Sequence, residues 1–199
     1  MLPVVHILIL AAGASSRMRG ADKLVQPIGP IPLLRHVAQV AVATGAPVSV
    51  TLPPDSPARR AALRGLDLRI VEVPDAALGM SRSLVRGIAA LAGGPRDGVM
   101  ILPADMPGFT TAALSDLIAR FQAEPHLILR GGTADGQPGH PTLFPHDLWP
   151  TLTQVAGDEG GRSVLQQNQG RVRVIPLLGP MATLDLDTPE DWAAWRAGG

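Results

Sequence analysis

The sequence contains no cysteine and no tyrosine, and it has few aromatic residues of any kind. The absence of cysteine excludes disulfides, thiolate metal ligands and cysteine nucleophiles. It also fits a reducing compartment, so we expect a cytoplasmic protein. Because aromatic residues make up only 3% of the chain, the core must be aliphatic, and base-stacking surfaces for single-stranded nucleic acid are not expected.

The chain also lacks an excess of charge of either sign and any long apolar run. Lysine and arginine total 17, and so do aspartate and glutamate, which argues against attachment to nucleic acid or to an anionic membrane by bulk charge. The longest apolar stretch, residues 2–14, is broken by Pro3, His6 and Gly13. We therefore predict neither a signal peptide nor a membrane-spanning helix.

What the sequence does contain is a regular alternation of short apolar runs and amphipathic segments. With 46% hydrophobic residues in 199, it predicts a single domain over residues 1–199, in which about 131–182 form a glycine- and proline-rich elaboration at a second ligand site. Strands are expected at 4–10, 48–52, 68–73, 99–102, 127–129, 172–175 and 183–186, and helices at 33–44, 56–64, 83–92, after the cap Thr110 and after Thr188. This order predicts an α/β fold with a mostly parallel central sheet flanked by helices.

Ligands of open parallel sheets bind beyond the carboxyl ends of the strands, so the loops after the predicted strands are searched first. The first of these loops begins with the small residues 10–13 (Leu-Ala-Ala-Gly) and continues to Arg17 and Lys23. Small residues let backbone N–H groups approach a phosphate, and the two cations place positive charge at the same mouth. The alternative is an ordinary turn that carries two solvated cations.

Two further loops offer carboxylates. Asp105 follows the strand at 99–102 and lies between two prolines, which suits a ligand of a hard divalent cation, although it could simply form a turn. Asp185 and Asp187 point to the same side of an extended segment. Asp187 is the candidate second metal ligand, and Asp185 could equally serve the dipole of the helix that follows.

Glycine-rich segments at 136–144 and 157–162 have the composition of loops that wrap a polar ligand. The first contains His140, whose backbone is restricted by a glycine before it and a proline after it. A lone histidine of this kind is more often structural than functional. No serine nucleophile motif and no His-x-x-His metal motif is present.

Taken together and in this order, the segments resemble the MobA-like NTP transferases, which are nucleotidyltransferases with a Rossmann-like fold of the glycosyltransferase-A type. Within that family the resemblance is closest to the molybdenum cofactor cytidylyltransferases, and it covers nearly the whole chain. The motifs that carry it are Leu10–Lys23, Gly79–Leu84, Ala104–Pro107, Gly139–Pro141, Gly157–Arg162 and Asp185–Asp191.

The resemblance implies that CTP and Mg²⁺ or Mn²⁺ bind over the first loop, and that the molybdopterin phosphate of the molybdenum cofactor attacks the α-phosphorus and releases pyrophosphate. It also implies delivery of the product to a recipient molybdoenzyme, with no nucleic acid or membrane partner. Carried over by position, the catalytic residues are Arg17, Lys23 and Asp105; the metal ligands Asp105 and Asp187; the nucleotide-binding residues Leu10, Ala11, Ala12, Gly13, Ser81 and Ser83; and the acceptor-binding residues His140, Pro141, Gly160 and Arg162.

The chain departs from the family pattern at two places. Arg19 follows Met18 where a glycine is usual, which lengthens the run to Lys23 by one residue, and Arg82 adds a charge between the two serines. Relatives that use guanine tend to have two glycines in the first loop, so the methyl group of Ala12 favours a pyrimidine. The open alternatives are a guanylyltransferase, a transferase acting on a sugar or alditol phosphate, and a non-catalytic carrier of the cofactor.

Overall fold

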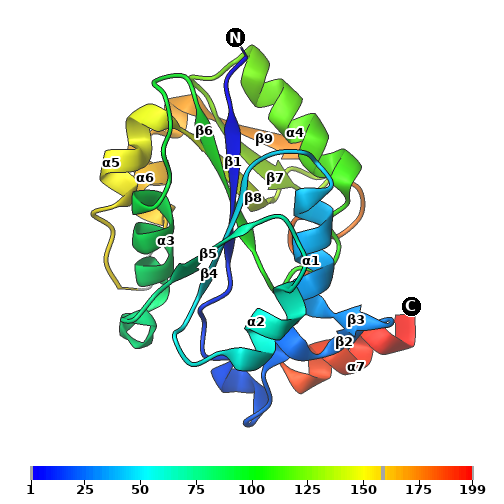
Figure 1. Ribbon diagram of the computed structural model, residues 1–199. Helices are drawn as coiled ribbons and strands as arrows, with labels where there is room; N and C mark the ends of the chain where they lie inside the picture. Colours follow the sequence, from blue (N-terminus) through cyan, green and yellow to red (C-terminus); the bar gives the residue numbers. More distant parts are fainter. Residues whose placement is uncertain (1, 158–159, 199) are drawn as a thin grey trace.

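The computed structural model describes residues 2–157 and 160–198, and a seven-stranded sheet runs through its centre in the order β5-β4-β1-β6-β8-β7-β9 (Figure 1). The strands are β1 (Val5–Leu10), β4 (Val48–Leu52), β5 (Arg69–Glu72), β6 (Gly98–Pro103), β7 (Ile128–Gly132), β8 (Pro138–Pro145) and β9 (Val172–Pro176). Strand β8 pairs antiparallel with β6 and β7, and the other neighbours in this sheet pair parallel. The predicted α/β fold with a mostly parallel sheet is confirmed.

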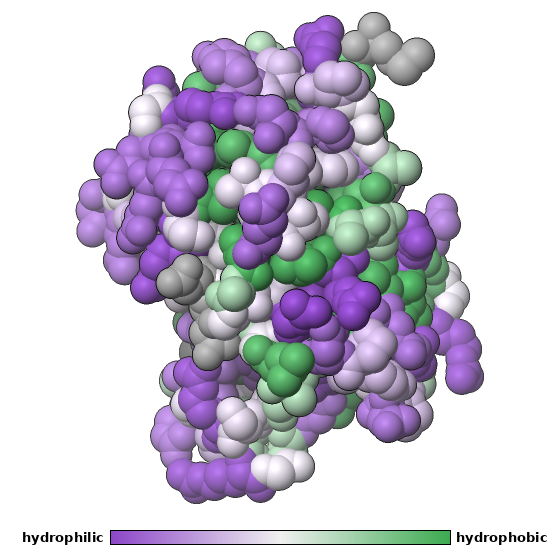
Figure 2. All heavy atoms as spheres, turned by 90° about the vertical axis from the view of Figure 1, so that its left-hand side faces the viewer, coloured by the Kyte–Doolittle hydropathy of each residue, from purple (hydrophilic) through white to green (hydrophobic). Residues whose placement is uncertain are grey.

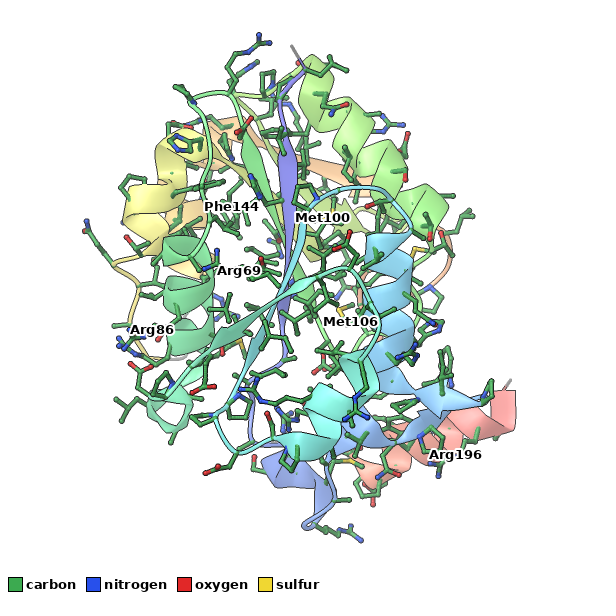
Figure 3. All side chains as sticks on the ribbon, in the orientation of Figure 1. Arg69, Arg86, Met100, Met106, Phe144 and Arg196 are labelled. Atoms are coloured by element: carbon green, nitrogen blue, oxygen red, sulfur yellow. The ribbon has the colours of Figure 1, made fainter. Side chains whose placement is uncertain are left out.

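Helices cover both faces of the sheet, because successive side chains of its strands point to opposite sides. Ile7 and Met100 belong to a core on one face, and Leu8 and Phe144 belong to a core on the other (Figure 3 labels Met100 and Phe144). The first core includes side chains of α1 (Leu33–Val42), α2 (Pro57–Leu63), α4 (Thr111–Ala123) and α7 (Pro189–Gly198), and the second includes side chains of α3 (Met80–Ala89), α5 (Trp149–Leu152) and α6 (Arg162–Gln167).

Short elements connect these layers. They are the hairpin β2 (Pro27–Ile28) and β3 (Ile31–Pro32), and the 3₁₀ turns η1 (Ser16–Met18), η2 (Lys23–Val25), η3 (Ala76–Leu78), η4 (His146–Leu148) and η5 (Gln169–Arg171). Two of them, η1 and η2, lie in the long loop that follows β1, so this loop is ordered by local turns.

Two helix starts follow their sequence signals. The hydroxyl of Thr110 accepts a hydrogen bond from the backbone N–H of Ala113, 3.2 Å away, as expected of an N-cap. Thr188 and Asp191 exchange bonds at the start of α7: the Asp191 carboxylate accepts from the Thr188 N–H at 2.8 Å, and the Thr188 hydroxyl accepts from the Asp191 N–H at 3.2 Å. Both predicted helix starts are therefore confirmed.

Two predictions about the second half of the chain were wrong. Residues 136–144 do not form a ligand-wrapping loop throughout, because most of them belong to β8 inside the sheet. A glycine is needed there since a Cβ on Gly139 would lie 2.0 Å from the carbonyl oxygen of Ala182. The strand predicted at 183–186 is absent from the described structure: Leu186 donates its N–H to the Asp105 carbonyl, 2.9 Å away, and this segment packs on a loop rather than pairing with a strand.

Hydrophilic residues cover most of the side of the molecule that carries α3 and α5, with small apolar patches between them (Figure 2). Within residues 2–157 and 160–198, no helix has both the length and the apolar character required to cross a membrane.

Candidate active site

The carboxyl ends of β1 and β6 lie side by side and bring together loops that are far apart in the sequence. Leu10, the last residue of β1, is in register with Pro103, the last residue of β6. The loop after β1 lies beyond this edge, at the lower end of the sheet in Figure 1. The segment before α7 is attached to the same edge by the bond from Leu186 to Asp105, so three separate segments meet there.

Three carboxylates converge at this edge. Asp105, Asp185 and Asp187 each present an oxygen within 4.8 Å of the others, an arrangement that could hold a metal ion. Carboxylate oxygens are the ligands preferred by Mg²⁺ and suit Mn²⁺ as well. The geometry thus brings together the predicted pair Asp105 and Asp187, and it adds Asp185, which the sequence left undecided.

Two cations of the β1 loop neutralise Asp105 and Asp187. The ammonium group of Lys23 lies 2.6 Å from Oδ2 of Asp105 and 2.5 Å from Oδ1 of Asp187. Arg17 forms an ion pair with Asp187 as well, and its side chain is 70% exposed whereas that of Lys23 is only 12% exposed. The Lys23 ammonium group therefore already lies between two of the carboxylates. Their oxygens are thus arranged to bind a positively charged ligand.

The pKa values of two groups register this arrangement. Burial acts to lower the pKa of Lys23, but the charges of Asp105 and Asp187 and their hydrogen bonds outweigh it, and the pKa is raised. The pKa of Asp185 is raised by burial first and by the negative charges of Asp105 and Asp187 second. Lys23 therefore does not fully offset the negative charge that Asp105 and Asp187 exert on Asp185. A divalent cation bound between the three carboxylates would reduce this repulsion further.

The small residues at the start of the loop pack closely against the sheet. Ala11 and Ala12 are buried and Gly13 is exposed. The N–H of Ala11 donates to the backbone carbonyl and the hydroxyl of Thr51, each 3.2 Å away, and Leu10 ends β1 beside it. The loop thus starts from a fixed backbone.

The predicted nucleotide-binding serines lie in the first turn of α3. The side chains of Ser81 and Ser83 are buried, and the Ser81 hydroxyl has no hydrogen-bond partner among the described residues. Arg82, between them, points away into an ion pair with Asp75: its Nε lies 2.6 Å from Oδ2. The added charge of Arg82 is therefore partnered, and contact of the serines with a nucleotide stays a prediction.

The predicted acceptor residues lie on β8, which carries His140 and Pro141, and at the start of α6, where Gly160 and Arg162 lie. His140 precedes Pro141 through a cis peptide bond, and its Nδ1 is buried without a partner in the described part of the chain. Burial lowers the pKa of His140, the charge of Arg130 lowers it further, and Asp105 opposes both. The histidine is therefore held neutral within reach of the charge of Asp105.

A half-buried arginine that the sequence did not single out stands beside this histidine. Arg130 of β7 donates from Nη2 to the Gly139 carbonyl, 3.2 Å away, and its Nε has no partner within the described residues. Its pKa is lowered by burial and then by the charge of Arg162. Gly160 and Arg162 lie at the start of α6, while two residues of the predicted motif 157–162, at 158 and 159, are outside the described residues.

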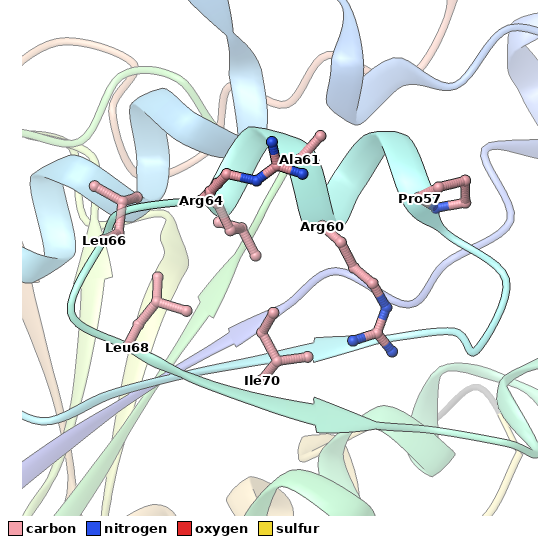
Figure 4. Close-up of a pocket in the computed structure, with 8 residues that line it drawn as sticks. Pro57, Arg60, Ala61, Arg64, Leu66, Leu68 and Ile70 are labelled. Carbon is pink, nitrogen blue, oxygen red and sulfur yellow. The ribbon is translucent and has the colours of Figure 1, made fainter.

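A shallow groove elsewhere on the surface contains none of these groups. It is formed by α2 and the segment that leads into β5, and Figure 4 shows Arg60 and Arg64 beside Leu66, Leu68 and Ile70. Its lining contains no carboxylate, so we place the candidate site at the triad.

The sequence of this chain is similar to known proteins and to one protein family. The bifunctional protein GlmU of Leifsonia xyli subsp. xyli is 32% identical over 120 residues, which cover 59% of this chain and 25% of GlmU. The chain thus spans about a quarter of that relative's length. Residues 7–172 match the model of a protein family described as the MobA-like NTP transferase domain.

Solved structures share the fold over nearly the whole chain. Rv0371c of Mycobacterium tuberculosis H37Rv superimposes with a TM-score of 0.82 at 27% identity, with 98% of each chain covered. A structure of Rv0371c in complex with manganese has a TM-score of 0.76 at 26% identity and 98% coverage of both chains. CMP:2-keto-3-deoxy-manno-octonic acid synthetase complexed with CTP has a TM-score of 0.72 at 17% identity, with 98% and 97% covered, and shares the fold alone.

The matched residues 7–172 contain most of β1, the loop with Arg17 and Lys23, and Asp105, while Asp185 and Asp187 follow after the matched range. Because that match covers most of the chain, the protein belongs to the MobA-like NTP transferase family.

Proposed function

We propose that this protein is a metal-dependent cytidylyltransferase that transfers CMP from CTP to the molybdopterin phosphate of the molybdenum cofactor and releases pyrophosphate. The observation that carries the reaction type is the convergence of Asp105, Asp185 and Asp187 with Lys23 and Arg17 at the end of the β1 loop. Carboxylates that hold a cation, next to cations that hold phosphates, are what nucleotidyl transfer requires.

The three carboxylates would hold a divalent cation, and the manganese complex of Rv0371c supports this assignment. Such a cation, when bound, neutralises charge on the triphosphate oxygens. Its arrival would release Lys23 and Arg17 from the carboxylates that they now neutralise. Both side chains could then turn to the β- and γ-phosphates and offset the charge that develops on leaving pyrophosphate.

The reaction needs no general base from the protein. An oxygen of the acceptor phosphate forms a bond to the α-phosphorus while the bond between that phosphorus and the bridging oxygen to the β-phosphate breaks, and pyrophosphate leaves. The acceptor phosphate is already ionised near neutral pH, since its second pKa is about 6. Catalysis then depends on positioning and on charge neutralisation.

We assign the binding of the acceptor to His140, Pro141, Gly160 and Arg162, and the structure suggests Arg130 as a further residue. Buried cations without an acidic partner are costly. The half-buried Arg130, repelled by Arg162, would be stabilised by an anionic group of the acceptor. The motif Gly139–Pro141, which resembles that of the molybdenum cofactor cytidylyltransferases, supports molybdopterin as the acceptor.

The choice of cytosine depends on the small residues at the start of the loop. Ala12 stands where relatives that use guanine tend to have a glycine, and the extra methyl group would favour the smaller pyrimidine base. A difference of one methyl group is worth about 1–3 kcal/mol in discrimination. That amount corresponds to a clear preference for CTP over GTP rather than to exclusive use of CTP.

The test is to incubate the protein with Mg²⁺, each nucleoside triphosphate in turn and one acceptor at a time, either the molybdenum cofactor or a sugar or alditol phosphate, and to measure pyrophosphate release. We expect the fastest release with CTP. Faster release with GTP would contradict the choice of base, and release only with a sugar phosphate or alditol phosphate would contradict the acceptor. Tight binding of the cofactor without release under any condition would identify a carrier instead of an enzyme.

A further inference from the structure

Arg59 is a charged residue that the fold buries almost completely. Its side chain is only 6% exposed, although it belongs to the short surface helix α2. It shares the buried side of this helix with Ala62 and Leu63, three and four residues further on. A guanidinium group taken out of water costs several kcal/mol unless it is paired and hydrogen-bonded, so its partners are informative.

Those partners all belong to the loop that follows β1. Nε of Arg59 lies 2.7 Å from Oδ2 of Asp22, and Nη2 lies 2.9 Å from Oδ1, so the carboxylate is held by two parallel bonds. Nη1 donates to the carbonyl oxygen of Ala11 at 2.7 Å, and Nη2 also reaches the hydroxyl of Ser15 at 3.4 Å. One planar guanidinium thus contacts the loop at three positions, which a lysine ammonium cannot reproduce.

The Asp22 carboxylate also forms hydrogen bonds that help to fix the backbone around Lys23. Its Oδ1 accepts the N–H of Leu24 at 3.0 Å and the hydroxyl of Ser15 at 3.3 Å. The Ser15 oxygen in turn accepts the N–H of Lys23, 3.3 Å away. Ser15 has a left-handed backbone with φ of 52°, a conformation that costs free energy and persists only where the surroundings impose it.

The start and the end of the loop are therefore fastened to the same buried group. Ala11 lies at the beginning of the small-residue segment, and Asp22 directly precedes Lys23, whose ammonium reaches the carboxylate triad. The run from Met18 to Lys23 is one residue longer than the usual family pattern, and the pair Arg59–Asp22 spans its far end. The Gln26 side chain also donates to the Asp22 carbonyl, but at 3.5 Å, so the shorter, charge-assisted bonds at Asp22 are those from Arg59.

We propose that the ion pair between the buried Arg59 and the half-buried Asp22 is a positioning device that holds the phosphate-binding loop in its active shape before the nucleotide arrives. This inference rests on the proposed function for the identity of the ligand, a nucleoside triphosphate with its divalent cation. Arg59 acts through the loop: its guanidinium contacts residues 11, 15 and 22, and the triad is contacted by Lys23. Preorganisation of this kind lowers the entropy cost of binding and sets the reacting geometry.

The chain offers a matched control for a purely structural arginine. Arg35 of α1 donates from Nη1 to the carbonyl oxygens of Ala62 and Arg64, at 2.8 and 3.0 Å, and so fastens the end of the same helix α2 without touching the β1 loop. Arg60, next to Arg59, lies over the groove in Figure 4 and pairs with Glu72 at 2.6 Å. Its side chain is 37% exposed, so Arg60→Met is measured alongside the other variants as a surface control, and we expect it to keep wild-type loop exchange and the wild-type response to CTP.

The experiment compares Arg59→Met, Asp22→Asn and Arg35→Met with the wild-type chain. Hydrogen–deuterium exchange is measured on each protein without ligand, and the rise in melting temperature is measured on addition of CTP with Mg²⁺. We expect amides of residues 12–24 to exchange at least ~10-fold faster in Arg59→Met and Asp22→Asn, because opening of the loop no longer requires breaking a charged pair. We expect the CTP-dependent rise in melting temperature to shrink in both variants, and kcat/KM for CTP to fall by about 100-fold.

Arg35→Met is expected to melt at a lower temperature than the wild type but to keep loop exchange and the CTP-dependent shift. Equal exchange in residues 12–24 for Arg59→Met, Asp22→Asn and the wild type, with the CTP shift intact, would overturn the inference. Asp22→Asn keeps the side-chain shape and serves as the test if Arg59→Met fails to fold. An absent CTP shift in the wild type would contradict the proposed function, while the exchange comparison still decides on the ion pair.

Arg59→Lys provides a last discrimination. It keeps the positive charge, but a lysine cannot bind the Asp22 carboxylate in a bidentate manner and also reach the Ala11 carbonyl. Compared with Arg59→Met, we expect it to restore the melting temperature more fully than the affinity for CTP. Full recovery of both would show that only the charge is required and would overturn the positioning role.

Discussion

Asp105→Asn removes one carboxylate charge from the proposed metal site while it keeps the shape of the side chain. Oδ2 of Asp105 lies 2.6 Å from the Lys23 ammonium, which retains Asp187 as a partner at 2.5 Å. The variant loses that attraction but is relieved of repulsion from the carboxylates of Asp185 and Asp187, all within 4.8 Å. Because the two effects oppose each other and Lys23 keeps Asp187 as a partner, we expect the free energy of unfolding to change by no more than about 1 kcal/mol.

The effect on activity should be far larger than the effect on stability. The loss of one preorganised group that stabilises charge in a transition state costs on the order of 10²–10³ in rate. We therefore expect pyrophosphate release from CTP to fall by about that factor, while thermal unfolding is nearly unchanged. Asp116→Asn, which alters an exposed carboxylate paired with Arg120 on α4, is the control. Wild-type turnover in Asp105→Asn would refute the assignment of this carboxylate as a metal ligand.

The remaining predictions concern the acceptor side, the packing behind the triad and the pH dependence of stability. Arg130→Met should leave the free energy of unfolding unchanged or increased, because it removes a half-buried cation without an acidic partner in the described chain. It should also raise KM for the acceptor about 10-fold without changing KM for CTP. An unchanged KM for the acceptor would show that Arg130 does not bind it. Gly139→Ala would place a Cβ 2.0 Å from the Ala182 carbonyl oxygen, and we expect a loss of about 1–3 kcal/mol in denaturant unfolding; a neutral effect would contradict the close contact. The hydrogen bond from Arg171 lowers the pKa of Asp147 in the folded state, so the pair stabilises the fold above the unfolded pKa of about 3.9, and this stability is lost as the pH falls through the lowered value. Asp147→Asn should therefore be slightly less stable than the wild type at pH 7 and equally stable near pH 2. A stability difference that is constant at all pH values would exclude this linkage.

Much of the sheet could be predicted from the sequence because its central parallel strands are buried on both faces. The runs that became β1, β4 and β6 are rich in valine, isoleucine and leucine, and each is followed by small residues, prolines or polar residues. Strand β8 lacked that signal, since a segment with proline and glycine is an unusual strand interior. It is a strand because β6 and β7 flank it and Ala182 approaches its backbone, and such long-range contacts leave no local pattern.

The site shows the same division. The loop cations and two of the carboxylates could be found from their places after predicted strands, whereas Asp22 and Arg59 pair across 37 positions of sequence and α2 reads locally as a solvated helix. One signal was available: Arg59 has the same helical spacing as the buried Ala62 and Leu63, which is an unusual place for a charge. Asp185 remained undecided because an acid before a helix start has an ordinary explanation, and only the fold shows that Asp105 and Asp187 lie beside it.

The central claim is that Asp105, Asp185 and Asp187 hold one divalent cation beneath a triphosphate carried by the β1 loop. Diffraction from crystals soaked with CTP and Mn²⁺, recorded where manganese scatters anomalously, tests it most directly. We predict one anomalous peak bonded to oxygens of these carboxylates, with the triphosphate over residues 10–13 and within reach of Lys23. A manganese peak away from all three carboxylates, or a triphosphate bound at another edge of the sheet, would contradict the account.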